Sequence, residues 1–279
     1  MTSSHKLILI TLFSLVIALS APWIGLSDIA DDILKQQILL DIRVPRVFFA
    51  FVAGAGLSLC GMVFQAMFHN PLATPFTLGV ASGASFGAAC TVFLGINVSL
   101  FGFDIITIGA FIGALVAITF VFFISQLQRG FSSETLLLTG VATSFFFSSL
   151  ILFIQYLSDM TDSFMIMRWL MGGLTSASYH SLLQLIPVVT VSTAIILWLS
   201  RELNLLMAGD DIALSRGVSV RQVRYLLFFS TSLCVGGIVA LSGPIGFIGM
   251  MVPHICRLII GTDHRWLTPA TIMFGGGFL

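Results

Sequence analysis

Charged side chains are scarce in this 279-residue chain, and their scarcity excludes several classes of protein. Only 9% of the residues are Asp, Glu, Lys or Arg, whereas about 25% are charged in an ordinary soluble domain. So little charge cannot cover a water-exposed surface, which excludes a cytosolic enzyme and a disordered chain. Lys and Arg number 12, as do Asp and Glu, so there is no basic surface for a nucleic acid.

The motifs of common enzymes are also missing. A P-loop needs Gly-Lys followed by Ser or Thr, and the two lysines, Lys6 and Lys35, lie in other contexts. Neither H-E-x-x-H nor G-x-S-x-G occurs, and the four cysteines form no C-x-x-C pair. His254 has no companion ligands for a metal ion. We therefore expect no enzymatic activity, no metal site and no cofactor bound by this chain.

Long apolar runs take the place of charge: 57% of the residues are hydrophobic and the mean hydropathy is +1.07. Lipid cannot hydrogen-bond a free backbone, so each long run predicts a membrane helix, and unbroken runs disfavour a β-barrel. The predicted spans are residues 7–26, 45–67, 77–95, 103–125, 135–157, 182–200, 223–241 and 246–260. The predicted fold is an all-α polytopic transmembrane bundle, one domain over residues 1–279.

Both ends of the chain leave alternatives open. The first run resembles a cleavable signal peptide, but it is long enough to span, and we interpret it as a membrane helix. The last run, residues 267–279, reaches only about 20 Å of a roughly 30 Å hydrocarbon core. It is either re-entrant or a ninth span that is cut short, and we favour the second.

Loop charges predict the orientation of the bundle. An inside N-terminus places eight basic residues on the cytoplasmic side, namely Lys6, Arg129, Arg201, Arg216, Arg221, Arg224, Arg257 and Arg265. Four others, Lys35, Arg43, Arg46 and Arg168, then lie outside, so the count favours this orientation.

The longest polar stretch, residues 201–224, is predicted to form two short helices on the cytoplasmic side. Gly209 ends the first, Asp210 caps the second, and Gly217 takes the left-handed position after it. The stretch also carries apolar side chains that need a partner. That partner is either this protein's own helix ends or another protein that docks here.

A few polar or helix-breaking residues stand out within or beside the spans. Thr135, Thr139 and Thr143 recur every four residues and so share one helix face. Asn70-Pro71 predicts a turn, and Pro253 predicts a break or kink in the last short span.

Six strings, in order, resemble one family: the permease subunit of the ABC importers for ferric siderophores, haem and cobalamin. They are RVPR (43–46), GMVFQAMFHNPLATPFTLGVASGAS (61–85), LLLTGVATS (136–144), WLMGGL (169–174), LNLLMAGDDIALSRGVSV (203–220) and SGPIGFIGMMVPHICRLIIGTDHR (242–265). The resemblance runs from about residue 40 to the end of the chain.

This resemblance implies a ten-helix permease of the inner (cytoplasmic) membrane, of which about eight spans are complete here and the C-terminal helices are missing. A second permease copy or a paralogue would pair with it. Two ATPase subunits would bind the ATP and magnesium, and a periplasmic or lipid-anchored binding protein would deliver the metal chelate. We expect a ferric siderophore as cargo, with cobalamin or haem as alternatives. An ion-coupled carrier and a non-transporting scaffold are more remote alternatives.

The resemblance also assigns roles to individual residues. It places Arg43 and Arg46 at the binding-protein docking surface, although these arginines could instead snorkel to the membrane interface. It assigns the pathway and gate to Ser132, Ser133, Thr135, Thr139 and Thr143, although hydrogen bonds between helices would also explain the threonines. Gln65 either shapes the turn with Asn70 and Pro71 or, as a polar group within a span, contacts the substrate on the pathway. The expected ATPase coupling surface comprises Leu203, Leu205, Leu206, Gly209, Asp210, Ile212, Ala213, Leu214, Gly217 and Val218.

Overall fold

The computed structural model describes residues 3–25, 32–96, 98–100, 102–127, 133–175 and 177–279, and it is almost entirely helical. Within these ranges one antiparallel ladder pairs β1 (Ser99–Leu100) with β2 (Phe103–Asp104). The all-α membrane fold is therefore confirmed, apart from this two-residue hairpin.

The helices follow one another as α1 (Ser3–Ser20), α2 (Asp32–Gln37), α3 (Val44–Phe68), α4 (Val80–Phe93), α5 (Ile105–Leu127), α6 (Ser133–Leu157), α7 (Met160–Leu170), α8 (Tyr179–Trp198), α9 (Ser200–Ala208), α10 (Asp210–Ser215), α11 (Val220–Ser242), α12 (Ile248–Ile260) and α13 (His264–Phe278). Three shorter pieces join them, namely η1 (Ala21–Trp23), η2 (Ile38–Arg43) and η3 (Pro75–Leu78). The π-helical η2 continues α2 into α3 without a gap.

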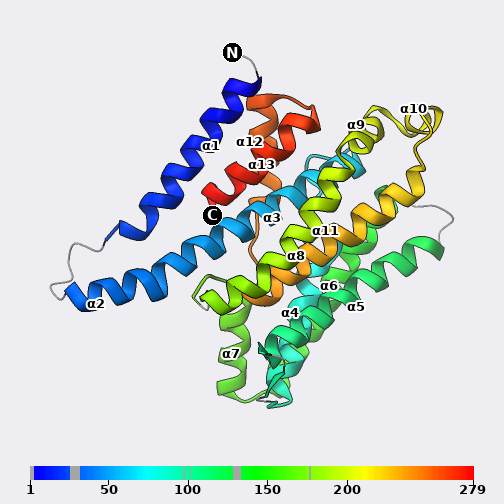
Figure 1. The fold of residues 1–279 in the computed structure, drawn as a ribbon. Helices are drawn as coiled ribbons and strands as arrows, with labels where there is room; N and C mark the ends of the chain where they lie inside the picture. Colours follow the sequence, from blue (N-terminus) through cyan, green and yellow to red (C-terminus); the bar gives the residue numbers. More distant parts are fainter. Residues whose placement is uncertain (1–2, 26–31, 97, 101, 128–132, 176) are drawn as a thin grey trace.

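Helix α3 is the centre of the bundle, and α8, α11, α12 and α13 pack around it (Figure 1). Every residue from Ala53 to Phe68 is buried, which is typical of a helix that is apolar on all sides. Glycines allow the close approach: a side chain at Gly54 or at Gly61 would collide with the backbone of Gly275 or of Gly249. The core therefore depends on small residues as much as on large ones.

Six helices in the described part of the chain are long and apolar enough to cross a membrane. They correspond to six of the eight predicted spans. The other two predicted spans, 77–95 and 246–260, contain shorter helices: α4 has 14 residues and α12 has 13. The first of these is shorter than predicted because Gly79, at φ +78°, separates η3 from α4.

One end of the bundle carries the start of α1, helices α9 and α10, and the connection between α12 and α13 (Figure 1). We call it the coupling end. The Lys6 ammonium on α1 donates to the Ile259 carbonyl of α12 here, at 2.7 Å. Helices α2 and α7 and the start of α8 lie at the opposite end (Figure 1).

Candidate functional site

Helices α9 and α10 form the predicted pair within residues 201–224. Gly209 separates them at φ +122°, and Gly217 follows α10 at φ +82°, in the left-handed region that favours glycine. Asp210 does not cap α10 as predicted. Gly209 takes the capping position, and Asp210 is the first helical residue, with its carboxylate turned to a different partner.

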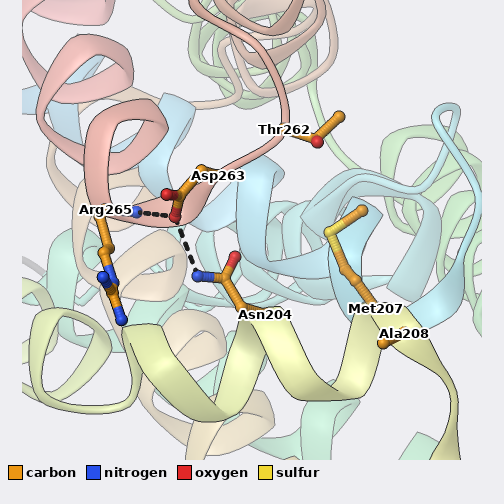
Figure 2. Close-up of a pocket in the computed structure, with 6 residues that line it drawn as sticks. All are labelled: Asn204, Met207, Ala208, Thr262, Asp263 and Arg265. Carbon is orange, nitrogen blue, oxygen red and sulfur yellow. Dashed lines mark hydrogen bonds between the residues drawn. The ribbon is translucent and has the colours of Figure 1, made fainter. Parts of the chain in front are cut away.

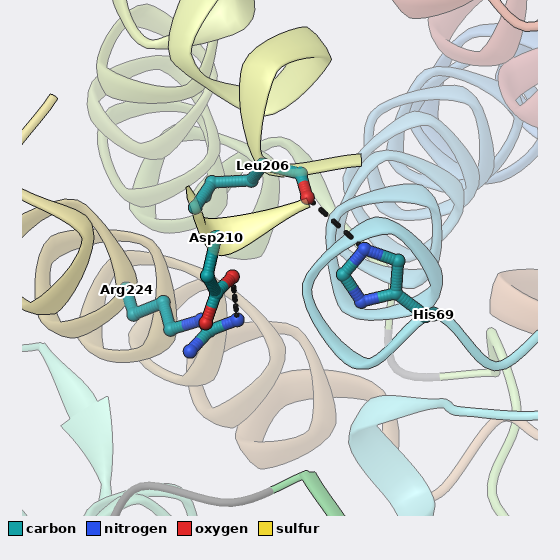
Figure 3. Close-up of polar contacts among 4 residues, drawn as sticks. All are labelled: His69, Leu206, Asp210 and Arg224. Carbon is teal, nitrogen blue, oxygen red and sulfur yellow. Dashed lines mark hydrogen bonds and ion pairs between the residues drawn. The ribbon is translucent and has the colours of Figure 1, made fainter. Parts of the chain in front are cut away.

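That partner is Arg224 on α11, whose Nη2 donates to Asp210 Oδ1 at 2.7 Å (Figure 3). The Arg224 side chain is 14% exposed and that of Asp210 is 44% exposed, so water screens this ion pair only in part. A second contact comes from α9, where the Leu206 carbonyl lies 3.0 Å from Nε2 of His69 (Figure 3). The pair of helices is thereby attached to α11 and to the end of α3.

A third attachment joins α9 to the start of α13 (Figure 2). Asp263 caps α13, and its Oδ1 accepts from the Arg265 backbone N–H and from Asn204 Nδ2, both at 3.0 Å. The Asn204 Oδ1 accepts from the backbone N–H of His264 at 3.0 Å and lies 2.8 Å from its Nδ1. Asn204 thus binds two consecutive residues of another helix.

These contacts change the acidity of both partners. The hydrogen bond from the Arg265 backbone lowers the pKa of Asp263, as do the Asn204 amide and the adjacent positive charges. Burial, and after it the Arg257 charge, lower the pKa of His264, Asp263 opposes both, and the net value is about 4. Sequence reasoning missed Asn204, Asp263 and His264 as a group, because 59 residues separate Asn204 from Asp263.

The apolar residues of this pair divide into two sets. Leu203, Leu206 and Ala213 are fully buried, and Leu205 and Val218 are half-buried against the same core. Their partner is this chain, one of the two alternatives that the sequence allows. Ile212 is 48% exposed and Leu214 is 58% exposed, so both are available on the outer face of α10 to a docking surface for another protein.

Gln65 is buried between α3 and α12 rather than on an open surface. Its Nε2 donates to the Met250 carbonyl at 3.1 Å and lies 3.5 Å from that of Gly249, while Arg257 donates to its Oε1 at 3.2 Å. Pro253 has no N–H to offer the Gly249 carbonyl. Pro253 does not break α12, which is continuous from Ile248 to Ile260, and the Gln65 amide donates to the backbone there.

The threonine stripe on α6 faces the protein interior. Thr139 is 9% exposed and Thr143 is 1% exposed, and the Thr143 hydroxyl donates to the Thr139 carbonyl at 2.7 Å. This face packs on η3, as a side chain at Gly140 would collide with the Thr77 carbonyl. The structure thus favours helix packing for these two threonines; Thr135 is half-buried.

The other predicted gate and turn residues lie near the coupling end. Ser133 begins α6, and Ser132 lies outside the described residues. His69 ends α3 at φ +49°, and the Asn70 Oδ1 then accepts from the Leu72 backbone at 2.9 Å. Asn70 and Pro71 therefore form the predicted turn, in which the Asn side chain bonds the backbone two residues on.

Arg43 and Arg46 lie at the opposite end. The Arg43 guanidinium donates to the carbonyls of Pro22 (3.2 Å), Ile24 and Gly25 (3.3 Å), so it holds the end of the first helix. Arg46 is half-buried, and its Nε has no partner among the described residues. The Arg43 guanidinium is therefore engaged by the backbone of this chain, whereas the Arg46 Nε is a buried donor without a partner among the described residues.

The sequence profile of the FecCD transport family matches residues 7–279. Among curated relatives, the cobalamin import permease BtuC of Halobacterium salinarum is 36% identical, over 95% of this chain and 70% of its own length. The hemin transport permease HmuU of Yersinia pestis is 36% identical over 87% and 73%. The molybdate import permease MolB of Haemophilus influenzae is 35% identical over 92% and 75%.

A solved structure described as an inward-facing metal-chelate type ABC transporter superposes with a TM-score of 0.89. It is 33% identical, and the match covers 99% of this chain and 88% of that one. The chain belongs to the FecCD transport family: it is the membrane-spanning permease subunit of an ABC importer, a multi-pass inner-membrane protein that leaves ATP hydrolysis to a separate subunit.

Proposed function

We propose that this permease carries a ferric siderophore across the cytoplasmic membrane, as one of two permease copies over two ATPase subunits. Its spans hold almost no ionisable side chains, and a bare metal ion would need ligands of that kind. A metal wrapped in an organic chelator needs none. The likeness to a metal-chelate type transporter supports this cargo class. Cobalamin and haem, named for two relatives, are the alternative cargoes of the same class.

The observation that best supports ATP-driven coupling is the attachment of the α9–α10 pair to the rest of the bundle. Ile212 and Leu214 project from it, and polar contacts from α9 and α10 reach three helices through His69 on α3, Arg224 on α11 and His264 on α13. In this proposal the coupling end faces the cytoplasm, and the ATPase docks on the outer face of α10. Closure of the ATPase dimer then displaces α10, and the contacts of α9 and α10 transmit this displacement to α3, α11 and α13.

At the opposite end, we propose that Arg46, with Arg43 beside it, meets acidic residues of the periplasmic or lipid-anchored binding protein. Opposite charges would steer the encounter and fix its register.

Reconstitution tests this proposal. The permease, its cognate ATPase and its cognate binding protein are assembled in proteoliposomes and offered radiolabelled ferric hydroxamate, ferric catecholate, cobalamin or haemin in parallel. We expect ATP-dependent uptake of a ferric siderophore, and none with an ATPase subunit that cannot hydrolyse ATP. Uptake of only cobalamin or only haemin would show that this compound, and not a ferric siderophore, is the cargo. Uptake that needs an ion gradient but no ATP would identify an ion-coupled carrier, and binding without flux would identify a scaffold.

A further inference from the structure

Two helices of the bundle are too short to cross the membrane. At 1.5 Å per residue, the 14 residues of α4 and the 13 of α12 reach about 20 Å of a roughly 30 Å core. Each follows a stretch outside the α-helices: residues 69–79, which include η3, before α4, and residues 243–247 before α12. We call residues 70–79 and 243–250 the cleft segments.

Packing contacts place the end of each irregular stretch at membrane depth. Gly249, in the first turn of α12, packs against Leu57 and Gly61 in the middle part of α3. Gly79, just before α4, packs against Thr143, which is about ten residues, or roughly 15 Å, into α6. The ends of both cleft segments, at Gly79 and Gly249, therefore lie inside the hydrocarbon layer that α3 and α6 cross.

The two cleft segments meet across a single cleft of about 270 Å³. One segment contributes Leu72, Thr74 and Phe76, and the other contributes Gly246, Phe247 and Met250. The cleft also borders α6, because its wall residue Thr77 lies against Gly140. None of the nine residues that line it carries a charge.

Lipid is not a suitable neighbour for such a surface. Irregular backbone at membrane depth is tolerated only where protein buries it or where it lines a water-filled cavity, since lipid cannot bond its free polar groups. Gly246 and Phe247 are both exposed on this chain. The cleft must therefore face either water or further protein rather than lipid.

Phe247 is the most unusual residue of the cleft. Its backbone has φ +66°, which is rare for any residue other than glycine, and its side chain is 72% exposed. Its carbonyl accepts from the Met250 and Met251 backbone N–H groups at 3.0 and 2.9 Å, which fixes the start of α12. A strained residue whose ring is largely exposed on its own chain indicates a functional position rather than a packing one.

We propose that this cleft opens on the translocation path and that the Phe247 ring contacts the organic shell of the metal chelate in transit. The inference rests on the proposed function and adds a residue to it. The uncharged wall of Phe76, Phe247, Leu72 and Met250 suits an organic surface, and weak apolar contacts let the cargo leave again. Phe247, not Thr139 or Thr143, is then the contact residue of this region.

Water accessibility tests the location without any transport. Phe247→Cys and Val116→Cys are made in a Cys90→Ser background, since Cys60, Cys234 and Cys256 are buried. Val116 is the control because it is 52% exposed at the centre of the regular helix α5. The probe is a charged, membrane-impermeant methanethiosulfonate applied to the assembled transporter. We expect Phe247→Cys to react at least about tenfold faster, because only a hydrated thiol ionises. Equal rates would overturn the proposal.

Phe247→Gly tests the contact itself. Glycine removes the ring and also relieves the positive φ, so the protein should keep its yield and thermal stability. We expect uptake of the transported chelate to fall several-fold at equal yield and thermal stability, and uptake equal to wild type would refute the contact. If the wild-type transporter moves none of the chelates, the proposed function fails, whereas the cysteine rates still decide where the cleft opens.

Discussion

Replacing Gln65 by Leu removes the side chain that joins α3 to α12, while it keeps a similar volume in the core. The structure shows what is lost: a hydrogen bond to the Met250 carbonyl at 3.1 Å, a long one to Gly249 at 3.5 Å, and one from Arg257 at 3.2 Å. Arg257 is affected most, because its Nε already lacks a partner among the described residues.

The cost follows from the type of each bond. A neutral hydrogen bond contributes about 0.5–1.5 kcal/mol, and one to a charged group about 1.5–3 kcal/mol. Hydrogen bonds between membrane helices contribute about 0.6 kcal/mol on average, which lies at the lower end of the range for neutral bonds. The sum for Gln65→Leu is a loss of about 2–3 kcal/mol in the free energy of unfolding.

Pro253 separates this explanation from a general packing defect. Pro253→Ala supplies the missing backbone N–H to the Gly249 carbonyl, four residues earlier, so the Gln65 amide is needed less. We expect Gln65→Leu to cost about 1 kcal/mol less in the Pro253→Ala background. Equilibrium unfolding in mixed micelles measures all four variants of this double-mutant cycle.

The reasoning fails if Gln65→Leu costs the same with and without Pro253. Gln65→Glu is the matched control, since its carboxylate can accept from Arg257 but cannot donate to the Met250 carbonyl. It should lose less stability than Gln65→Leu, and a larger loss would show that the contact with Arg257 is of little value.

Three further predictions concern the two ends of the bundle. Leu214→Asp should abolish uptake while the ATPase rate persists, because it places a charge in the docking face of α10. Ser215→Asp on the same helix is the control, and normal uptake by Leu214→Asp would refute the docking surface. Stability should fall as the pH drops from about 6.5 towards about 4, because the unfolded state then protonates His264 while the folded state does not. His264→Asn should flatten that slope and the exposed His254→Gln should not, as pH-dependent melting would show. Arg46→Glu should weaken capture of the binding protein, and unchanged affinity by surface plasmon resonance would contradict its docking role.

Local chemistry predicted part of the coupling region correctly. Gly209 and Gly217 were predictable because left-handed or extended positive-φ backbone favours glycine wherever it occurs. The capping role of Asp210 was not, because Arg224 on the next long helix takes its carboxylate. Likewise, the spacing of Thr139 and Thr143 establishes that they share a face, but only the position of η3 shows that this face is buried.

The sequence by itself determined the membrane class, six of the spans and the family, because hydrocarbon allows only long apolar helices and because ordered strings of residues are specific. It did not determine which apolar side chains of residues 201–224 are free, since burial depends on neighbours such as α3 and α11. Only the tertiary structure decided that Ile212 and Leu214 project, that Gln65 bonds the backbone beside Pro253, and that the segments before two short helices line one cleft with Phe247. Each of these depends on contacts between residues far apart in the chain, which spacing along the sequence cannot encode.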